Sequence, residues 1–587
     1  MTLSPSRTWK RSTGSSWWRL AWLPIAILTW PVVGAAQQLP PGATPPAATN
    51  SLNRNFLRDD QRRLLEEQRE KLEQLERLPG REAKPSAPVT PPSTECVQVD
   101  DIDLNGVTRF NAQRQQAWVA PYEGRCLTVE DFNALLGDIT NAYVDQGFVT
   151  TRAYLAQQDL TQRQLKVVVF EGRIEALEST NSTPTSREIS MASPVAAGDV
   201  LNLRDLEQLV DQLGRLPSRQ STMELVPGEE VGGSRVQLDS EGGRPVRFSL
   251  GRNNDGTEDT GEQQWALGFE WDSPLGLADQ LRMQWGHDVT GHSGIGSRDG
   301  YIDYSVPFGY WNFSYSYTES AYDTVAEADG FLFDYDGVSQ RHRLMAERLL
   351  HRDQVSKTSA SVALSRVTTR NNIDGQRIDL SSQTLADVTL GFNHGRRIGS
   401  ALVNADLQWS KGLRNFGAQH DENKVSGEPK AQFEKTMLTL SAVQPFSLFD
   451  QSLRFTSLAY GQWSDDVLYS PYRLTIGGLE SVRGFKEQSL SGDSGAYWRN
   501  EVSWHLPLEM ARPVFHSMEL SLGYDMGVIH HGDHNPELHG RMTGYAVGLG
   551  LQGEHLAVDV STAHSLERPE FIEDDETPVY FNVTAFL

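Results

Sequence analysis

Apolar and polar residues alternate one by one over long stretches of residues 246–587. In Trp265–Trp271, Leu281–Trp285, Trp498–Leu506 and Met518–Met526, the apolar and aromatic residues fall on alternate positions. Successive side chains of a strand point to opposite faces, so this pattern predicts strands with one apolar and one polar face. Soluble sandwiches and transmembrane barrels are both built from such strands.

Two features favour the barrel. The expected strands are long and rich in Tyr and Trp, and the alternation continues through residues 579–587. Lipid-exposed strands must close on themselves because no backbone group can stay unpaired in hydrocarbon. The apolar face would then meet lipid and the polar face would line the lumen. At about 10 residues per strand plus loops, residues 246–587 fit roughly 16 strands.

Composition excludes several other classes. The chain has 587 residues, a formal net charge of -24 and a mean hydropathy of -0.46. This hydropathy does not fit a bundle of membrane helices, and the acidity argues against non-specific nucleic-acid binding. Two cysteines exclude a Cys-based zinc framework. The sequence contains no G-x-x-x-x-G-K-[ST] motif. We therefore expect no cofactor, no ATP site and no enzymatic activity.

Residues 1–36 have the layout of an export signal. Arg7, Lys10, Arg11 and Arg19 precede an apolar run, and Gly34-Ala35-Ala36 ends the segment. A charged region, a short apolar region and small residues predict a cleaved signal peptide, with a retained anchor as the alternative. Exported chains meet an oxidising compartment, where Cys96 and Cys126 can form a disulfide. Two unrelated thiols are the alternative.

The next sections are a short helix between two flexible segments. Residues 37–50 are rich in Pro and Ala, which predicts disorder. Residues 51–78 lack Gly and Pro and carry a thin stripe of leucines among balanced charges, which predicts a polar helix. Residues 79–93 contain several prolines and are expected to be a linker. A solvated helix or a short coiled coil would account for the same composition.

Two small α/β modules follow, at 94–175 and 176–245. In the first, residues 97–102 alternate as a strand, and Thr128 caps a helix that ends at Gly147. Residues 150–155 and 165–170 are further strands of this module. In the second, residues 203–213 form a helix with one apolar face, and residues 223–226 and 235–239 form strands.

Short motifs occur in a set order along these sections. The first module carries Gly124–Thr128, Tyr143, Gly147–Arg152 and Glu171-Gly172. The second carries Leu201–Gln208, Pro227-Gly228 and Gly233-Ser234, and the last section carries Val482-Arg483-Gly484-Phe485 and Gly523–Gly527. In this order after an export signal, the chain resembles the TpsB-type transporters of two-partner secretion. These are the haemolysin and filamentous-haemagglutinin exporters, within the superfamily of POTRA-bearing outer-membrane barrels.

The resemblance covers the chain from about residue 51 onward and implies a complete layout. Residues 51–78 would be a plug helix in the lumen, 94–175 and 176–245 two POTRA domains, and 246–587 the transmembrane barrel. The protein would lie in the outer membrane of a Gram-negative bacterium, with its POTRA domains in the periplasm. One departure is the ending Phe586-Leu587, because such barrels commonly end in an aromatic residue.

The resemblance also implies a site. Val482, Arg483, Gly484 and Phe485 would lie in the sixth extracellular loop, folded back into the lumen. Asp525 falls on the polar face of its strand, so we expect Arg483 and Asp525 to form an ion pair there. Two separately solvated lumen charges are the alternative.

The expected function is export of one large TpsA-type exoprotein, bound unfolded by the POTRA domains and passed through the barrel without ATP. Other expected partners are outer-membrane lipid and, during biogenesis, periplasmic chaperones and the barrel-assembly machinery. The alternatives are a general outer-membrane assembly or insertion factor and a passive porin. The cargo, its activation and the direction of threading are not readable from this chain.

Three weaker signals are set aside. Residues 492–495 (Gly-Asp-Ser-Gly) match the nucleophile stretch of some serine proteases, but a triad also needs a placed His and Asp. Histidines at 530, 531, 534 and 539 share one polar loop. We interpret it as a surface loop, with a metal site as the weaker alternative. The acidic residues 573–576 are expected to form a solvated loop, with a Ca²⁺ site as the weaker alternative.

Overall fold

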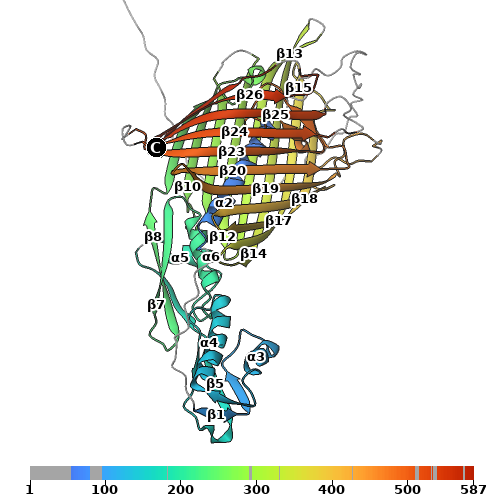
Figure 1. The fold of residues 1–587 in the computed structure, drawn as a ribbon. Coiled ribbons are helices and arrows are strands. Elements are labelled where there is room, and N and C mark those ends of the chain that lie inside the picture. The colour runs from blue at the N-terminus through green and yellow to red at the C-terminus, as the bar shows by residue number, and fades with distance from the viewer. Residues whose placement is uncertain are drawn as a thin grey trace, which may run out of the picture. The chain divides into compact units, whose positions relative to one another are not determined.

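The computed structural model describes residues 54–79, 95–181, 183–289, 294–328, 331–422, 424–425, 427–508, 514–530, 532, 539–572 and 575–587. The expected signal peptide (1–36), the segment 37–50 and all but Pro79 of the linker 79–93 lie outside these residues. A helix, two α/β modules and a barrel follow one another along the described chain (Figure 1). Among the described residues, no helix combines the length and the apolar character needed to span a membrane.

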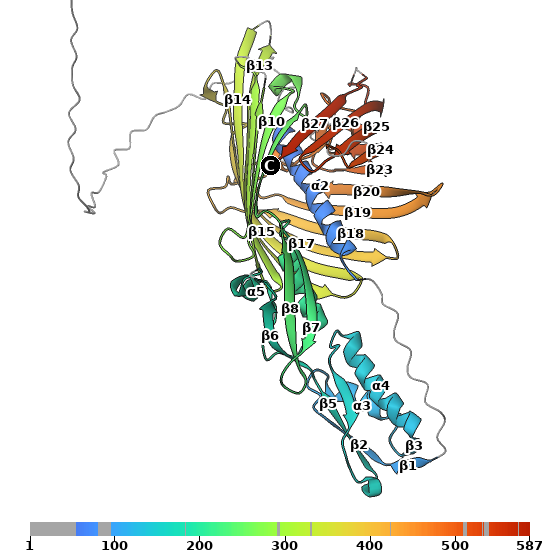
Figure 2. The same cartoon turned by 90° about the vertical axis from the view of Figure 1, so that its left-hand side faces the viewer.

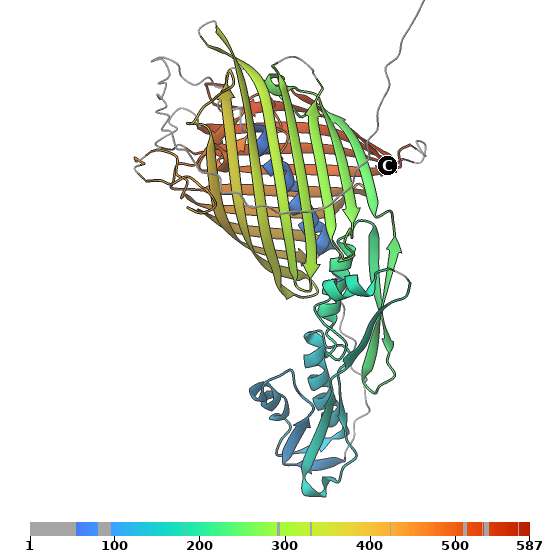
Figure 3. The same cartoon turned by 180° about the vertical axis from the view of Figure 1, so that it is seen from behind.

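Sixteen strands of the described chain close into an antiparallel barrel, which confirms the expected architecture (Figure 3). They are β9 Val246–Asn253, β10 Gln264–Asp272, β11 Gln280–Asp288, β12 Gly296–Phe308, β13 Trp311–Ala328, β14 Phe331–Arg352, β15 Ser356–Ile373, β17 Gln383–Ile398, β18 Ala401–Gly412, β19 Glu434–Leu448, β20 Gln451–Trp463, β23 Gly495–Pro507, β24 Ser517–Ile529, β25 Gly540–Gln552, β26 Leu556–Glu567 and β27 Val579–Phe586. A two-residue piece, β16 (Gln376–Arg377), pairs with the end of β15.

The alternation of each strand separates an apolar outer face from a polar lumen. Along β10, Trp265, Leu267 and Trp271 are exposed on the outside, whereas Gln264 and Asp272 are buried. A soluble protein would bury the first set, because apolar surface leaves water favourably. The outer wall is therefore a lipid-facing surface.

The barrel closes where its first strand meets its last. β9 and β27 share five paired residues, from Asn582↔Asn253 to Phe586↔Ser249, whereas β24 and β25 pair from Ser517↔Gln552 to Ile529↔Gly540. Beyond the Asn582↔Asn253 pair, the side chain of Asn254 continues the ladder. Asn254 Oδ1 accepts from the Phe581 amide at 2.7 Å, and Asn254 Nδ2 donates to the Val579 carbonyl at 2.7 Å.

The first module contains β1 Cys96–Val99, β2 Asp101–Asn105, α3 Ala112–Val119, β3 Arg125–Thr128, α4 Val129–Asp145, β4 Arg152–Leu155 and β5 Gln164–Phe170. Strand β5 lies between β2 and β4, and β1 pairs separately with β3. Thr128 and Asp131 form a capping box at α4. The expectation of one strand over residues 97–102 is wrong. The strand is interrupted at Asp100, whose amide donates to the Arg163 carbonyl. The segments before and after Asp100 therefore join different sheets.

The second module contains β6 Arg173–Ser179, α5 Ser186–Ala192, α6 Leu203–Gly214, β7 Arg219–Pro227 and β8 Gly233–Gly242. The sheet order is β6-β8-β7, and α6 buries its leucine face against it. Strands β7 and β8 extend beyond the predicted ranges 223–226 and 235–239. The prediction was too short because most of the additional residues are polar and show no apolar alternation. Helices α3 and α5 were not predicted, since both are shorter than three turns and carry little periodic signal.

Helix α2 (Arg54–Glu76) runs through the barrel interior (Figure 2). Its 23 residues make a helix of about 34 Å. A second segment also enters the interior. We call residues 464–494, between β20 and β23, the lumen loop; it contains the small hairpin β21 Leu474–Ile476 and β22 Leu490–Gly492.

Candidate functional site

The lumen loop carries its own small hydrophobic core. Val482 and Phe485 are fully buried in one cluster with the hairpin residues Leu474, Ile476 and Leu490. Barrel residues Tyr497, Ile529 and Met542 belong to the same cluster, and Leu65 of α2 packs against it. The motif residues 482 and 485 therefore fasten the loop to the barrel wall by burial of apolar surface.

Between them, the Arg483 side chain points the other way and meets Asp525 on β24. Arg483 Nε donates to Asp525 Oδ2 at 2.7 Å, and Nη2 donates to Oδ1 at 2.9 Å. The Arg483 amide adds a third bond to Oδ2 at 3.1 Å. Asp525 is fully buried. The structure thus brings together the two charges that the sequence placed in the lumen, in a bidentate geometry.

A second carboxylate, which sequence reasoning missed, completes this cluster. Arg483 Nη1 pairs with Glu501 on β23, and Nη2 also donates to the Asn500 carbonyl at 3.3 Å. Glu501 shares the inward face of its strand with Arg499, which donates to the Glu480 carbonyl at 2.9 Å. The alternation along β23 points Glu501 inward, and the register pairs it with Gly523, two residues from Asp525, within reach of Arg483.

Two glycines allow the loop to approach the wall this closely. A Cβ at Gly523 would overlap the Arg483 guanidinium, and a Cβ at Gly484 would lie 2.6 Å from the His564 carbonyl oxygen. Gly544 lies opposite Gly484, at an irregular step in the pairing of β25 with β26. Because glycines on both surfaces have no side chain, the lumen loop can pack directly against the barrel wall.

The first turns of α2 bind the lumen loop and the neighbouring wall. Arg54 donates to the carbonyls of Lys486 and Glu487, the second at 2.7 Å. Arg62 lies 3.1 Å from Asp255 and 3.2 Å from Glu480. These arginines lie on one helix face, as the spacing of eight residues requires.

The later turns of α2 bind the wall through mixed contacts. Gln68 Oε1 accepts from Asn404 and Ser441, each at 2.9 Å. Lys71 pairs with Asp406, and Glu70 lies 2.8 Å from Arg282. The leucine stripe at 72, 75 and 78 is buried against Leu402 and Val443. A cavity of about 1300 Å³, lined by charged and polar side chains, remains around the helix.

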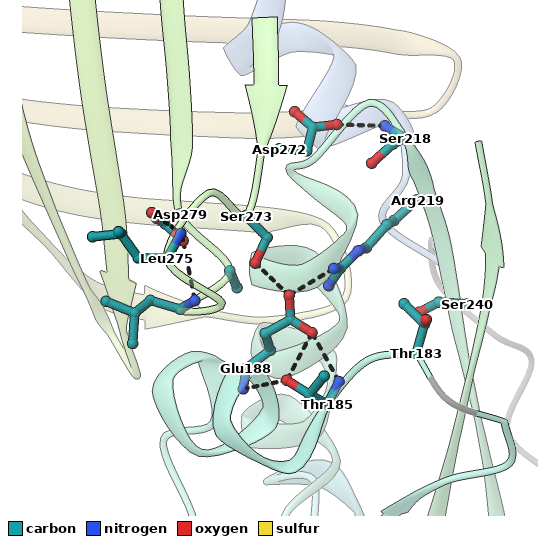
Figure 4. Close-up of polar contacts among 12 residues, drawn as sticks. Thr183, Thr185, Glu188, Ser218, Arg219, Ser240, Asp272, Ser273, Leu275 and Asp279 are labelled. Atoms are coloured by element: carbon teal, nitrogen blue, oxygen red, sulfur yellow. Dashed lines mark hydrogen bonds and ion pairs between the residues drawn. The ribbon is translucent and has the colours of Figure 1, made fainter. Parts of the chain in front are cut away.

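A polar junction joins the second module to the barrel (Figure 4). Glu188, at the start of α5, accepts from Arg219 at 2.6 Å and from Ser273 in the β10–β11 turn. Its other oxygen accepts from the amide and hydroxyl of Thr185. Burial alone would raise the pKa of Glu188, but the hydrogen bonds from Arg219, Ser273 and Thr185 together hold it below its ordinary value.

The junction has a second part on the opposite side of the module. Arg352, at the end of β14, lies 3.1 Å from Glu207 and also pairs with Asp211, both on α6. Lys357 of β15 pairs with Asp211 as well. Each part consists of buried or half-buried ion pairs. Removal of one partner from such a pair strongly destabilises the folded protein.

Motif residues of the first module build a structural hub. Glu171 accepts from the Tyr143 hydroxyl at 2.6 Å and from the Thr108 amide at 2.7 Å. A Cβ at Gly172 would overlap Thr150, and one at Gly147 would overlap Asn202. The Gly147 carbonyl accepts from the Leu203 amide at 2.8 Å, so this glycine lies at the contact between the modules.

One edge of the first module presents apolar side chains to solvent. Strand β4 ends the order β2-β5-β4, so one side of it has no strand neighbour in the described structure. Tyr154 of β4 and Phe170 of β5 are about half exposed and stack edge to face with centroids 5.9 Å apart. An exposed aromatic pair beside an open strand edge is a typical peptide-binding surface.

Comparison with known proteins agrees with this architecture. The haemolysin secretion/activation proteins ShlB/FhaC/HecB match residues 232–551, a ShlB-type POTRA domain matches 97–172 and a POTRA domain matches 173–227. The outer membrane transporter CdiB of Dickeya dadantii (strain 3937) is 33% identical over 92% of this chain and 95% of its own. The chain belongs to the ShlB/FhaC/HecB family.

Two further relatives support the assignment. The haemolysin transporter protein ShlB of Serratia marcescens is 28% identical over 72% of this chain and 74% of its own. The solved structure of CdiB from Escherichia coli is 30% identical, has a TM-score of 0.85, and covers 91% of this chain and 98% of that one. Like its relatives, this ShlB/FhaC/HecB member is an outer-membrane protein with two periplasmic POTRA domains and a 16-strand barrel.

The periplasmic position of the POTRA domains shows which end of the lumen is extracellular. The turns that meet the second POTRA domain, such as 273–279, are periplasmic, so the lumen loop starts and ends at the extracellular side. The first turn of α2 lies near the extracellular end of the lumen. Its last turn lies near the periplasmic end, where Arg397 donates to the Leu78 carbonyl at 2.9 Å.

The motifs set aside above have structural contacts here. Asp493 accepts from Arg473 at 3.2 Å, and Ser494 donates to the Ser464 carbonyl at 3.1 Å, so this stretch braces the base of the lumen loop. Glu576 accepts from the amides of Glu487 and Gln488. Positions 531, 534, 573 and 574 lie outside the described residues. Within the described residues, no cluster of His, Cys, Asp and Glu has the arrangement of a metal site.

Proposed function

We propose that this protein binds one large exoprotein of the TpsA type in the periplasm, unfolded, and passes it through the barrel to the cell surface. The observation that carries the proposal is the lumen. It holds a helix whose contacts with the wall are mainly polar and ionic, in a barrel joined to two POTRA domains. The relatives named as haemolysin and CdiB transporters support the same function.

Cargo recognition is assigned to the first POTRA domain. An extended chain adds to the open edge of β4 by main-chain hydrogen bonds, which demand little of its side chains. Tyr154 and Phe170 flank this edge and supply apolar contact. This arrangement suits an unfolded client, whose backbone groups are free to pair.

Helix α2 acts as the resting plug and leaves before the cargo enters. Most of its contacts are hydrogen bonds and ion pairs, and water replaces such contacts at a small net free-energy change, about 0.5–1.5 kcal/mol per hydrogen bond. Apolar burial is lost by the leucine stripe, by Leu65 and by Phe56, which packs with Phe433 and Tyr472. The helix is therefore held firmly by many contacts, each of which is weak.

The Arg483–Asp525 pair keeps the lumen loop seated while the plug leaves. Its geometry is bidentate and Asp525 is fully buried, so separating the two groups would leave an uncompensated buried charge. Transport needs no ATP in this scheme, because folding of the cargo outside the cell supplies the driving force. Chaperones and the barrel-assembly machinery act during biogenesis, and outer-membrane lipid surrounds the mature barrel.

A deletion strain tests the function. Culture medium and outer membranes of the deletion strain and its parent are compared by mass spectrometry. We expect one large protein to disappear from the medium or cell surface while other barrels stay normal. A general fall in outer-membrane barrels would contradict secretion and favour an assembly factor.

A paired substitution tests the recognition step. Tyr154→Ser with Phe170→Ser should lower secretion at least about tenfold while the barrel stays folded. Val231→Ser, at a position 95% exposed in the second POTRA domain, is the matched control and should secrete normally. Equal secretion by the variant and the control would refute the role of β4.

A further inference from the structure

An apolar groove lies on the outer wall of the barrel. It runs over β19, β20, β23 and β24 near their extracellular ends and has a cavity volume of about 520 Å³. The side chains that form it include Leu440, Ala459, Trp463, Ala496, Trp498 and Val528. We call it the outer groove. It lies on the lipid side of the wall, opposite the side on which Tyr497 and Gly527 contact the lumen loop.

Small residues between two indoles create the hollow. Ala459 pairs directly with Trp498, and Gly461 pairs with Ala496, so the floor has almost no side chains. Trp463 folds back over Gly461, where an added Cβ would lie 2.7 Å from its ring. Farther along β24 the outward positions carry the larger side chains of Leu520, Leu522 and Tyr524.

The walls of the groove are held in place. Trp498 Nε1 donates to Ser457 Oγ at 2.8 Å, which satisfies the polar end of the indole and fixes the ring. Trp498 and Trp463 are nevertheless about half exposed. The volume of this open groove falls within the range of about 300–1,000 Å³ that is usual for small-molecule sites.

A cation stands at the extracellular rim. Arg541, at the start of β25, lines the groove and pairs with Val528 across the ladder. Its Nε lies 3.3 Å from Glu567, and its side chain stays 51% exposed. A guanidinium binds phosphate oxygens in a fork geometry.

We propose that the outer groove binds one acyl chain of a phosphorylated glycolipid of the outer leaflet, with the phosphate at Arg541. Three features fit this occupant. The slot is apolar, it opens toward the hydrocarbon of the extracellular half of the membrane, and its cationic rim lies at headgroup level. Aromatic side chains at this depth also match the interfacial belt of membrane barrels.

Lipid retention by the purified full-length protein tests the proposal. The protein is placed in nanodiscs that contain a bisphosphorylated, multiply acylated glycolipid in phosphatidylcholine, and retained lipid is counted by native mass spectrometry. Ala496→Phe fills the slot and should lower glycolipid retention at least about tenfold. Ala360→Phe, which adds the same volume to the outer face of β15, should leave retention unchanged. Heat-modifiable migration on gels checks that each barrel is folded.

Two further measurements test the contact between the phosphate and Arg541. Arg541→Gln should weaken retention about five- to tenfold, and the wild type should retain a dephosphorylated glycolipid about as weakly. Equal retention by wild type, Ala496→Phe and Ala360→Phe would overturn the proposal. So would a result in which Ala496→Phe converts a dimer to a monomer without changing lipid retention, because the groove would then be a contact between two copies. In a barrel that tolerates no Phe at 496, quenching of Trp fluorescence by an acyl-brominated glycolipid gives the decision. Trp463→Phe with Trp498→Phe should remove more of this quenching than the control Trp265→Phe with Trp271→Phe, and equal losses in the two pairs would refute the site.

Discussion

Arg62 of the plug helix lies 3.2 Å from Glu480 of the lumen loop, although the two residues are 418 positions apart in the chain. Asp255, in the loop between β9 and β10, shares the same guanidinium at 3.1 Å. Plug, loop and wall therefore meet at one charge. Removal of the plug leaves Glu480 and Asp255 close to each other without the cation between them.

The first prediction concerns this shared charge. Arg62→Gln should increase the frequency of open-channel events in planar bilayers several-fold, because both carboxylates lose their counter-ion on the helix. Arg69→Gln is the matched control, since Arg69 is mostly exposed and pairs with Glu73 of its own helix. Equal opening frequencies in the two variants would show that the Arg62 contacts do not hold the plug.

The second prediction concerns the whole helix. Deletion of residues 54–76 should raise the single-channel conductance, because the helix occupies the lumen along its length. The measurement is the conductance of single channels in planar bilayers at fixed salt. A conductance equal to that of the wild type would remove the plug role from α2.

The third prediction concerns the seat of the lumen loop. Asp525→Asn should lower secretion strongly, because it leaves the buried Arg483 with part of its charge unpaired, a change of about 3–5 kcal/mol. A charge swap, Arg483→Asp with Asp525→Arg, should restore only part of the activity, because the new aspartate faces Glu501. Adding Glu501→Gln to the swap should restore more. A swap no better than either single change, with or without Glu501→Gln, would count against the pair.

The fourth prediction concerns pH at the junction of the second POTRA domain and the barrel. The folded-state pKa of Glu188 lies below the unfolded-state value of about 4.3. Ionised Glu188 therefore stabilises the junction above the unfolded-state pKa, and this contribution is lost as the pH falls through the folded-state pKa. Spin labels on cysteines introduced at Ala197 and Leu275 should show a broader distance distribution below pH 4. Glu188→Gln should be broad already at pH 7 and should change less with pH than the wild type. A narrow distribution in that variant at pH 7 would contradict the role of Glu188.

The fifth prediction concerns the disulfide between Cys96 and Cys126, which closes a loop with a sequence separation of 30 and joins β1 to β3. Cys96→Ser with Cys126→Ser should destabilise the first POTRA domain by roughly 3–4 kcal/mol, on the loop-entropy estimate. Limited proteolysis of the full-length protein should then cut within residues 95–170 before it cuts the barrel. Val231→Ser, in the other POTRA domain, serves as the control. Unchanged cleavage in the double variant would show that the disulfide adds little.

The barrel could be predicted from sequence because strand alternation is a local signal. Trp265–Trp271 shows its two faces without reference to any other segment. The same signal placed Asp525 in the lumen. It could not find Glu501 as a partner of Arg483, because that contact depends on the register of β23 on β24 and on the path of the lumen loop. Register and loop path are non-local and leave no periodic trace.

The modules show the same limit on a smaller scale. The capping box at Thr128 and the leucine face of α6 are local, and both occur where the sequence predicts them. The break at Asp100 is not local, because the backbone partner of its amide lies at Arg163. Likewise, the junction contacts of Glu188 join residues 31 and 85 positions apart. Nothing in the sequence near residue 188 indicates either partner.

The five-pair closure between β9 and β27, extended by the Asn254 side chain, makes the barrel mechanically uneven around its circumference. Stretching force applied from inside would concentrate there, since fewer backbone hydrogen bonds share the load than between other neighbouring strands. A side-chain amide can break and re-form its hydrogen bonds without unravelling a strand. If the barrel widens, we therefore expect the wall to open first between β9 and β27.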